Sequence, residues 1–307
     1  MRRVAAVDCG TNSIRLLIAD IDPERKVLTD IVRDMRIVRL GEGVDRTGRL
    51  SAAALDRTIG ALRDYAELIG QASPQAIRMI ATSATRDAEN SQEFTGRVKE
   101  VLGVAPEVVT GDEEAALSFT GATRELTETP SPYLVTDIGG GSTEFVLGGP
   151  GGVSGGRSVD IGCVRMTERH LHGDPPPQAE IAAATRDIDS ALDLVAAAIP
   201  AETARTLVGL AGSVTTVAGI ALGLRAYDAS RIHHSRIPAG QVHEIATGLL
   251  GQTRAQRAAI GVMHPGRVDV IGAGALVLDR IMTRFGFAEV LVSEHDILDG
   301  IAWSLVQ

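Results

Sequence analysis

Residues 4–20 have the sequence VAAVDCGTNSIRLLIAD, and residues 133–148 have the sequence YLVTDIGGGSTEFVLG. Both stretches consist of an apolar run, an aspartate, a turn of small residues and a second apolar run. When the aspartates are aligned, three residue types coincide: Asp8 with Asp137, Gly10 with Gly139, and Ser13 with Ser142. The match predicts two copies of one strand–turn–strand unit, and therefore an internally duplicated fold.

Each turn has the chemistry of a phosphate-binding loop. A tight turn of glycine and small hydroxyl residues exposes backbone N–H groups, and such amide clusters bind phosphate oxygens without a formal positive charge. The glycines at 139–141 lack Cβ atoms, so a ligand can approach the backbone closely. We expect the two turns to face each other across a cleft and to clamp a phosphate chain.

Acidic residues next to the turns predict a metal ion, Mg²⁺ or another divalent cation. Hard cations take carboxylate and water oxygens as ligands. The candidate ligands are Asp8, Asp137 and Glu144. The chain has no GxxxxGK[ST] motif, so the turns are not Walker A loops.

Strand-like and helical segments alternate around the first turn. Residues 51–69 have helical spacing with Ser51 as the candidate N-cap, and residues 76–81 have strand character. This alternation predicts α/β layers. Farther along, the glycine-rich residues 148–156 and the apolar residues 272–277 are interpreted as turns.

The domain boundaries are expected near a polar segment with two prolines, residues 127–132, which is typical of a linker. The expected parts are a first domain of residues 1–126, a second domain of residues 127–295, and a C-terminal helix at residues 296–307 that packs back on the first domain.

Composition excludes several functions. The net charge of −9 and the aromatic content of 3% argue against a nucleic-acid partner. No apolar run approaches the roughly 20 residues of a membrane span, so we expect no membrane partner. Cys9 and Cys163 form no CxxC motif and are expected to be small buried residues of a cytoplasmic protein.

The histidines at 233–234 and at 170 and 172 lack cysteine or carboxylate partners at ligand spacing. We interpret them as solvated loop residues rather than metal ligands.

Several further segments, in order along the chain, resemble those of the exopolyphosphatase and guanosine-pentaphosphate phosphatase family. They are ATSATRDAENS at 81–91, TGDEEAALSFTG at 110–121, SVDIGCVRMTE at 158–168, LVGLAGSVTTVA at 207–218 and RVDVIGAGALVLDRIM at 267–282. The resemblance implies a duplicated actin-like, or ribonuclease H-like, ATPase fold with two domains flanking a cleft.

The resemblance also implies residue roles. Glu114 matches the family's general base, with its neighbour Glu113 as the weaker candidate. Arg86 and Arg15 would contact terminal phosphates. Asp137 and Glu144 match acids that position metal or water. The residues that would cradle phosphate are Gly10, Thr11, Asn12 and Ser13 in the first turn, and Gly139, Gly140, Gly141, Ser142 and Thr143 in the second.

The implied reaction is hydrolysis of the terminal phosphoanhydride bonds of inorganic polyphosphate. Phosphoryl transfer needs positioning and charge neutralisation, and no nucleophile signature is present, so direct attack by water is expected. Alternatives are a 5′-phosphatase of guanosine pentaphosphate, another nucleotide phosphatase, a kinase-like phosphotransferase, and a non-catalytic actin-like regulator. By analogy with the family, a homodimer is also expected.

Three departures from the family pattern qualify the resemblance. Cys9 replaces an aliphatic residue, and Val214 replaces a common glycine. Longer relatives carry an additional C-terminal helical region that this sequence lacks. The expected consequence is a preference for short polyphosphates or nucleotides.

Overall fold

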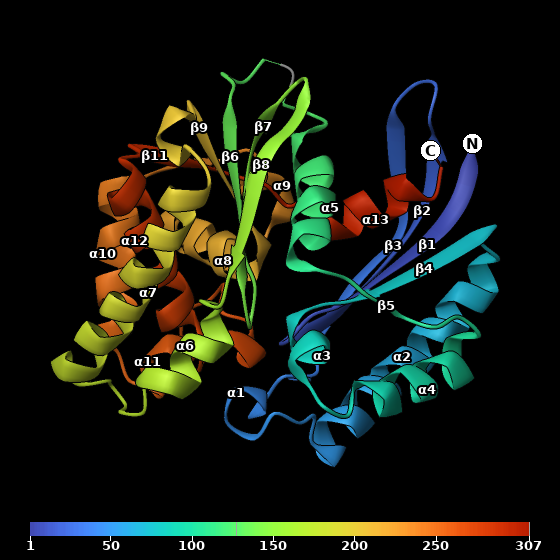
Figure 1. The fold of residues 1–307 in the computed structure, drawn as a ribbon, viewed down its shortest axis with the longest axis horizontal. Helices are drawn as coiled ribbons and strands as arrows, with labels where there is room; N and C mark the ends of the chain where they lie inside the picture. The colour runs from blue at the N-terminus through green and yellow to red at the C-terminus, as the bar shows by residue number, and fades with distance from the viewer. Residues whose placement is uncertain (127, 307) are drawn as a thin grey trace. The chain divides into compact units, whose positions relative to one another are not determined.

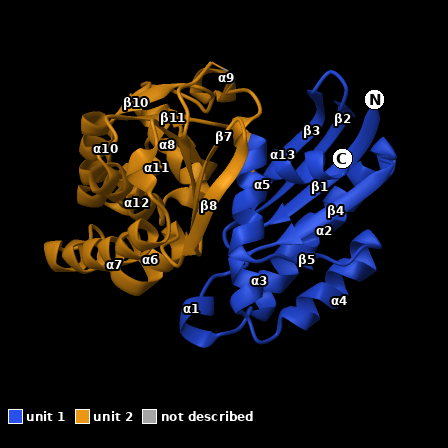
Figure 2. Cartoon of the chain, turned by 45° about the horizontal axis from the view of Figure 1, so that its top comes forward, with its two compact units in different colours: residues 1–121, 297–307 blue, residues 122–296 orange. Residues whose placement is uncertain are grey.

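The computed structural model describes residues 1–126 and 128–306. It forms two compact units (Figure 2): unit 1, which comprises Met1–Gly121 and Ile297–Gln307, and unit 2, which comprises Ala122–Asp296. The predicted linker and the predicted C-terminal helix each include one residue outside the described ranges, Thr127 and Gln307 respectively.

Each unit contains one mixed sheet (Figure 1). The sheet of unit 1 has the order β3-β2-β1-β4-β5 and consists of β1 (Arg2–Cys9), β2 (Ser13–Asp22), β3 (Val27–Ile37), β4 (Ala76–Ala81) and β5 (Glu107–Val108). The sheet of unit 2 has the order β10-β11-β9-β6-β7-β8 and consists of β6 (Tyr133–Ile138), β7 (Thr143–Gly149), β8 (Gly152–Val159), β9 (Thr206–Leu210), β10 (Arg236–Pro238) and β11 (Glu289–Val292).

The two sheets share one topology. In unit 1, β1–β2 and β2–β3 are antiparallel, whereas β1–β4 and β4–β5 are parallel. In unit 2, β6–β7 and β7–β8 are antiparallel, whereas β6–β9 and β9–β11 are parallel. Strand β10 extends the second sheet at its edge. The predicted duplicated α/β fold is confirmed.

The helices of unit 1 are α1 (Val44–Thr47), α2 (Ala52–Ala72), α3 (Ser83–Asp87), α4 (Ser91–Leu102), α5 (Gly111–Thr123) and α13 (Ile297–Ser304). Those of unit 2 are α6 (Cys163–His170), α7 (Gln178–Ala198), α8 (Ala211–Ala221), α9 (Ala229–Ile232), α10 (Ala239–Gly251), α11 (Arg254–Ala258) and α12 (Ile271–Phe285), with 3₁₀ turns at Ala201–Thr203 and Pro265–Arg267. No described helix is both long and apolar enough to cross a bilayer.

Both faces of the first sheet are buried, which is why β1 is apolar at consecutive positions. Side chains alternate between the faces of a strand. Ala5 and Val7 belong to the core beneath α2 and α4, whereas Val4 and Ala6 belong to a separate core beneath α13. The predicted N-cap is confirmed, since the Ser51 side chain accepts a hydrogen bond from the N–H of Ala54 at the start of α2.

Helix α13 packs against the first sheet by a close approach and an ion pair. Trp303 and its apolar neighbours fill the core beneath it. Arg33 of β3 donates to the Asp299 carboxylate at 2.5 Å. Gly300 permits close contact with α5, because a Cβ atom there would lie 2.1 Å from the carbonyl oxygen of Leu117.

Two sequence interpretations are wrong. Strand β7 extends to Gly149 and β8 begins at Gly152, so the predicted glycine-rich turn at 148–156 does join two strands but is confined to Pro150 and Gly151. Residues 272–277 lie in α12 rather than in a turn. Their buried apolar side chains contribute to the core of unit 2, and this packing outweighs the low helix propensity of Gly272 and Gly274.

Replacement of Gly300 by alanine tests the contact between α13 and α5. Because the new methyl group meets backbone that cannot move cheaply, Gly300→Ala is expected to destabilise the protein by roughly 1–3 kcal/mol. Gly60→Ala in α2 is the matched control, since a Cβ atom there meets nothing within 4 Å. The control is expected to stabilise by about 0.5–1 kcal/mol. Urea unfolding measures both, and equal effects would contradict the close approach.

Candidate active site

The first hairpin turn joins β1 to β2, and its carbonyl groups accept hydrogen bonds from the segment that follows β3. The Gly10 N–H donates to the Ser13 carbonyl oxygen at 2.9 Å. The Gly41 N–H donates to the Thr11 carbonyl oxygen at 2.8 Å. The Asn12 side chain is 7% exposed, and neither of its polar atoms has a partner among the described residues. A buried polar group without a partner is costly, so Asn12 indicates a place where a polar ligand binds.

The second hairpin turn, between β6 and β7, repeats this arrangement. The Gly139 N–H donates to the Ser142 carbonyl oxygen at 3.0 Å. The beginning of α6 holds the turn from behind, where the Val164 N–H donates to the Gly140 carbonyl oxygen at 2.8 Å. Gly162 has no room for a side chain, because a Cβ atom would lie 2.2 Å from that same oxygen. In both units, therefore, the segment after the third strand binds the carbonyl groups of the turn.

The N–H groups of both turns remain available to a ligand. Within the described part of the chain, no protein acceptor binds the N–H groups of Thr11, Asn12, Gly140, Gly141 and Ser142. Such unpaired amides, next to carbonyls already bound, form a concave donor cluster suited to phosphate oxygens. Such a donor cluster is consistent with the predicted phosphate-binding turns, and phosphate binding stays a prediction.

The register of each hairpin places an acid opposite a different partner. In unit 1, Asp8 lies opposite Arg15, and Arg15 Nη2 donates to Asp8 Oδ2 at 2.7 Å. In unit 2, Asp137 lies opposite Glu144, at 7% and 1% exposure. Ser158 of β8 donates to Glu144 Oε1 at 2.7 Å. Directly opposite side chains share one face of a sheet, so the second hairpin carries two buried acids where the first carries an ion pair.

Glu114 and Arg86 lie together in unit 1. Helix α5 is capped by Thr110, whose hydroxyl accepts from the Glu113 N–H at 3.2 Å. Glu114 occupies the first turn of this helix. Arg86, near the end of α3, donates from Nη1 to Glu114 Oε2 at 3.3 Å and to the Val109 carbonyl oxygen at 2.9 Å. The predicted base and one predicted phosphate-binding arginine are therefore in contact.

The two neighbouring glutamates have different surroundings. The Glu113 side chain is 48% exposed and lies 3.2 Å from Arg78. The Glu114 side chain is only 11% exposed and lies against Arg86. Adjacent residues on a helix point about 100° apart, which explains the difference. Of the two glutamates, Glu114 is the one sheltered from solvent.

The side chains of three other predicted site residues are hydrogen-bonded to groups of the protein. The Thr143 hydroxyl donates to the Ile161 carbonyl oxygen at 3.0 Å, so this side chain supports the hairpin. The Thr11 hydroxyl is hydrogen-bonded to that of Ser83 at 2.9 Å. Arg15 donates from Nε to Asp8 Oδ2 as well, at 2.9 Å.

The cysteines are small buried residues, as predicted. Cys9 and Cys163 are free thiols inside the two cores. Burial raises the pKa of both thiols, and the charge of Asp8 adds to this effect at Cys9. Both therefore stay protonated at neutral pH and are poor nucleophiles.

The interpretation of the histidines as solvated loop residues is wrong for His233 and His170. His233 Nε2 lies 3.1 Å from Glu125 Oε2, and His170 Nε2, at the end of α6, lies 2.8 Å from Asp187 Oδ2. Burial raises the pKa of Glu125, but the His233 hydrogen bond and the neighbouring imidazoles outweigh it, so this pKa is below its ordinary value. Glu125 is 108 residues from His233, so local spacing could not identify it.

Sequence reasoning missed the groups that hold the turns from behind. These are Gly41 in unit 1, and Gly162 with the start of α6 in unit 2. Arg165 also donates from Nε to the Gly141 carbonyl oxygen at 2.7 Å. The segment 158–168 resembles a family motif, and that resemblance was the available signal.

Residues 17–307 match the Ppx/GppA phosphatase family. The chain belongs to this family. Exopolyphosphatase 2 of Mycobacterium tuberculosis is 51% identical over 316 residues, which is 99% of each chain. The crystal structure of an exopolyphosphatase-like protein is 42% identical with a TM-score of 0.95, over 99% of this chain and 98% of that one. A Ppx/GppA enzyme of Aquifex aeolicus is 31% identical with a TM-score of 0.82, over 99% of each chain.

Membership of this family makes the chain an enzyme, a hydrolase of phosphoanhydride bonds. The second hairpin and Glu114 lie within residues 17–307, which match the family. The two-sheet α/β fold agrees with the superposition on the Aquifex aeolicus enzyme.

Replacement of Gly162 tests whether α6 must hold the second turn. Gly162→Ala forces a methyl group onto the Gly140 carbonyl, so the turn must move and its amides lose their alignment. We expect KM for the phosphorylated substrate to rise about tenfold or more, because small misplacements of binding groups are costly. Gly151→Ala, at the other end of the same strand pair, is the control, since a Cβ atom there meets nothing within 4 Å. An unchanged KM in Gly162→Ala would show that the turn does not bind substrate.

Proposed function

We propose that this enzyme is an exopolyphosphatase, which removes terminal phosphates from inorganic polyphosphate by direct attack of water. The observation that carries the proposal is the pair of hairpin turns with unpaired amides in a protein 51% identical to an exopolyphosphatase. A polyphosphate chain repeats one chemical unit, and the duplicated hairpins repeat one phosphate-binding unit. Two like phosphate-binding turns suit a substrate made of like phosphate units, which supports polyphosphate as the substrate class.

Substrate binding relies on neutral donors. The proposed phosphate ligands are the amides of Thr11 and Asn12 in the first turn and of Gly140, Gly141 and Ser142 in the second, with the Asn12 side-chain amide as an additional donor. Fixed amide dipoles attract phosphate oxygens and need no reorganisation. This is consistent with a chain whose net charge is −9. Arg15 is proposed to act through Asp8, whose carboxylate it binds, and to contact phosphate with its guanidinium group.

Glu114 is the proposed general base. Its carboxylate would accept a proton from water as the water oxygen attacks the terminal phosphorus, and the bridging oxygen would leave with the remaining chain. Arg86 orients this carboxylate through the 3.3 Å contact. It also brings a guanidinium group to the place where charge develops on the transferring phosphate. Arg86 is therefore proposed to act on both the base and the phosphate.

Asp137 and Glu144 are the proposed ligands of Mg²⁺ or another divalent cation. Their donor set fits, because two opposed carboxylates buried to 7% and 1% exposure favour a cation with oxygen ligands. When bound, Mg²⁺ would supply charge neutralisation for the phosphate oxygens. Ser158 fixes the orientation of Glu144. Asp8 is a weaker ligand, because Arg15 already neutralises it.

Short chains are the proposed preference. A long polyanion would need a track of cationic side chains, whereas many arginines of unit 1 are engaged in ion pairs, for example Arg3 with Asp20 and Arg57 with Glu42. Guanosine pentaphosphate presents the same terminal phosphates and is the second candidate substrate. A cytoplasmic location is supported by the two free cysteines. The homodimer remains a prediction.

The glutamate pair in α5 offers a direct test of the base. Glu114→Gln keeps the shape and removes the proton acceptor, so kcat is expected to fall about 10²–10⁴-fold with little change in KM. Glu113→Gln is the matched control and is expected to keep kcat within about twofold, because the Glu113 side chain is 48% exposed and pairs with Arg78. Phosphate release from a short polyphosphate measures both. Equal kcat values for Glu114→Gln and the wild type would assign the base elsewhere.

A substrate series tests the proposed specificity. Pure enzyme with Mg²⁺ is incubated with polyphosphates of defined length, guanosine pentaphosphate, ATP and ADP, and free phosphate is assayed. We expect kcat/KM to be highest for short polyphosphates. A clear preference for chains of hundreds of units would refute the short-chain proposal. Absence of phosphate release from every substrate would favour the regulator.

A further inference from the structure

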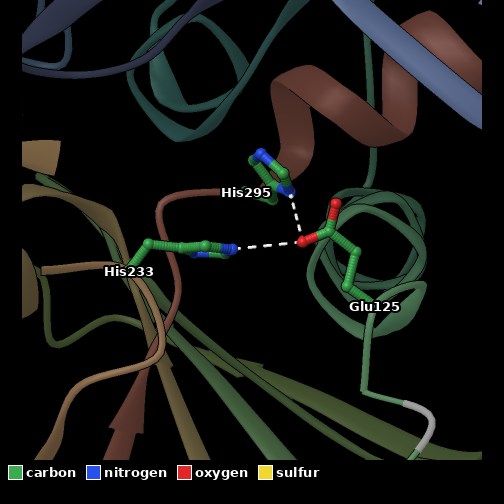
Figure 3. A group of neighbouring side chains, drawn as sticks. All are labelled: Glu125, His233 and His295. Carbon is green, nitrogen blue, oxygen red and sulfur yellow. Dashed lines mark hydrogen bonds and ion pairs between the residues drawn. The ribbon is translucent and has the colours of Figure 1, made fainter. Parts of the chain in front are cut away.

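Three side chains from separate segments of unit 2 converge outside the hairpins (Figure 3). Glu125 follows the end of α5, His233 is the C-cap residue of α9, and His295 follows β11. Figure 3 shows the rings of His233 and His295 directed at the same carboxylate oxygen. None of the three residues belongs to the proposed catalytic machinery.

The spacing of these groups is that of ligands around a metal ion. Glu125 Oε2 lies 3.1 Å from His233 Nε2 and 3.5 Å from His295 Nδ1. One donor atom from each of the three residues lies within 4.8 Å of the others. Ligands at about 2.0–2.2 Å from a tetrahedral ion lie about 3.3–3.6 Å apart, so small side-chain movements would enclose one.

We propose that Glu125, His233 and His295 bind a Zn²⁺ ion. Two imidazoles and one carboxylate form a ligand set that suits borderline-soft Zn²⁺ rather than Mg²⁺, which prefers oxygen donors throughout. A water molecule would complete the coordination. This ion is distinct from the cation proposed at Asp137 and Glu144.

Zn²⁺ binding through His233 would break an existing hydrogen bond, which weakens the site. The Glu294 N–H donates to His233 Nδ1 at 3.1 Å, so the ring proton of neutral His233 is on Nε2. To coordinate the ion through Nε2, His233 must shift this proton to Nδ1 and give up the hydrogen bond from Glu294. We therefore expect a weaker site than one with a preformed tautomer.

A neighbouring cavity provides access. It has a volume of about 290 Å³, and its lining includes Glu125, His234 and Arg236. The His234 ring stacks on that of His233 at 3.8 Å between centroids and restrains its position. A hydrated ion can therefore reach the carboxylate from solvent.

The site would tie together the two ends of unit 2. Glu125 lies shortly after Ala122, where unit 2 begins, and His295 lies shortly before Asp296, where it ends. A bound ion would join these ends and, if it binds only the folded state, would stabilise the protein. We therefore assign the ion a structural role.

Metal binding to the full chain tests the proposal. The protein is dialysed against Zn²⁺ in excess Mg²⁺, and bound zinc is measured by mass spectrometry. One Zn²⁺ per chain is expected. His295→Gln and Glu125→Gln are each expected to weaken Zn²⁺ binding at least about tenfold. His243→Gln is the matched control, because His243 pairs with Asp279 at 3.1 Å and belongs to no such three-residue group among the described residues. Glu144→Gln is expected to leave Zn²⁺ binding unchanged.

A second measurement uses the unaltered protein, so it does not depend on the folding of variants. Zn²⁺ is expected to protect His233 and His295, but not His243, from modification by diethyl pyrocarbonate. Either of two results overturns the proposal: no zinc retained against Mg²⁺, or zinc retained without protection of His233 and His295. Full zinc affinity in His295→Gln and Glu125→Gln would overturn it as well. A failure here would leave the phosphatase reaction untouched, since that reaction is measured separately.

Discussion

The hydrogen bond from a glycine N–H to the carbonyl oxygen of the serine three residues later closes both hairpin turns, at 2.9 Å in unit 1 and 3.0 Å in unit 2. Because each turn carbonyl is also bound from behind, the amides have no competing acceptor in the described chain. The antiparallel strands set the length of each turn, and the segment after the third strand donates hydrogen bonds to the turn's carbonyl groups. Gly41 and Gly162 are small because that segment contacts the turn directly.

Duplication gave two copies of this hairpin, and a single cross-strand position differentiates them. Arg15 in the first copy neutralises Asp8, whereas Glu144 in the second copy adds to the charge of Asp137. The scaffold is the same, since both pairs are directly opposite in register. The first hairpin therefore carries an ion pair, whereas the second carries two acids, which is the basis of the proposed cation site.

Contacts between distant segments shape the rest of the protein. Helix α13, at the end of the sequence, completes the core of the first unit by covering a sheet face that the N-terminal residues leave apolar. Arg86 and Glu114 come from different βα segments of the same unit and meet because β4 and β5 are adjacent parallel strands. The group of Glu125, His233 and His295 in unit 2 likewise brings together residues that are far apart in the sequence.

The sequence by itself determined the duplicated α/β fold, the two hairpin turns and the buried cysteines. These features depend on short-range patterns: strand alternation, glycine spacing and local apolar runs. The resemblance to a known family indicated Glu114 and Arg86 as site residues and ranked Glu114 above Glu113, and the structure added that Glu114 is the more buried of the two. The tertiary structure alone decided the partners of Arg15 and Glu144, the helical state of residues 272–277, and the carboxylates beside His170 and His233. Each of these depends on groups that packing brings together, and a linear pattern does not encode which distant residue will be the neighbour.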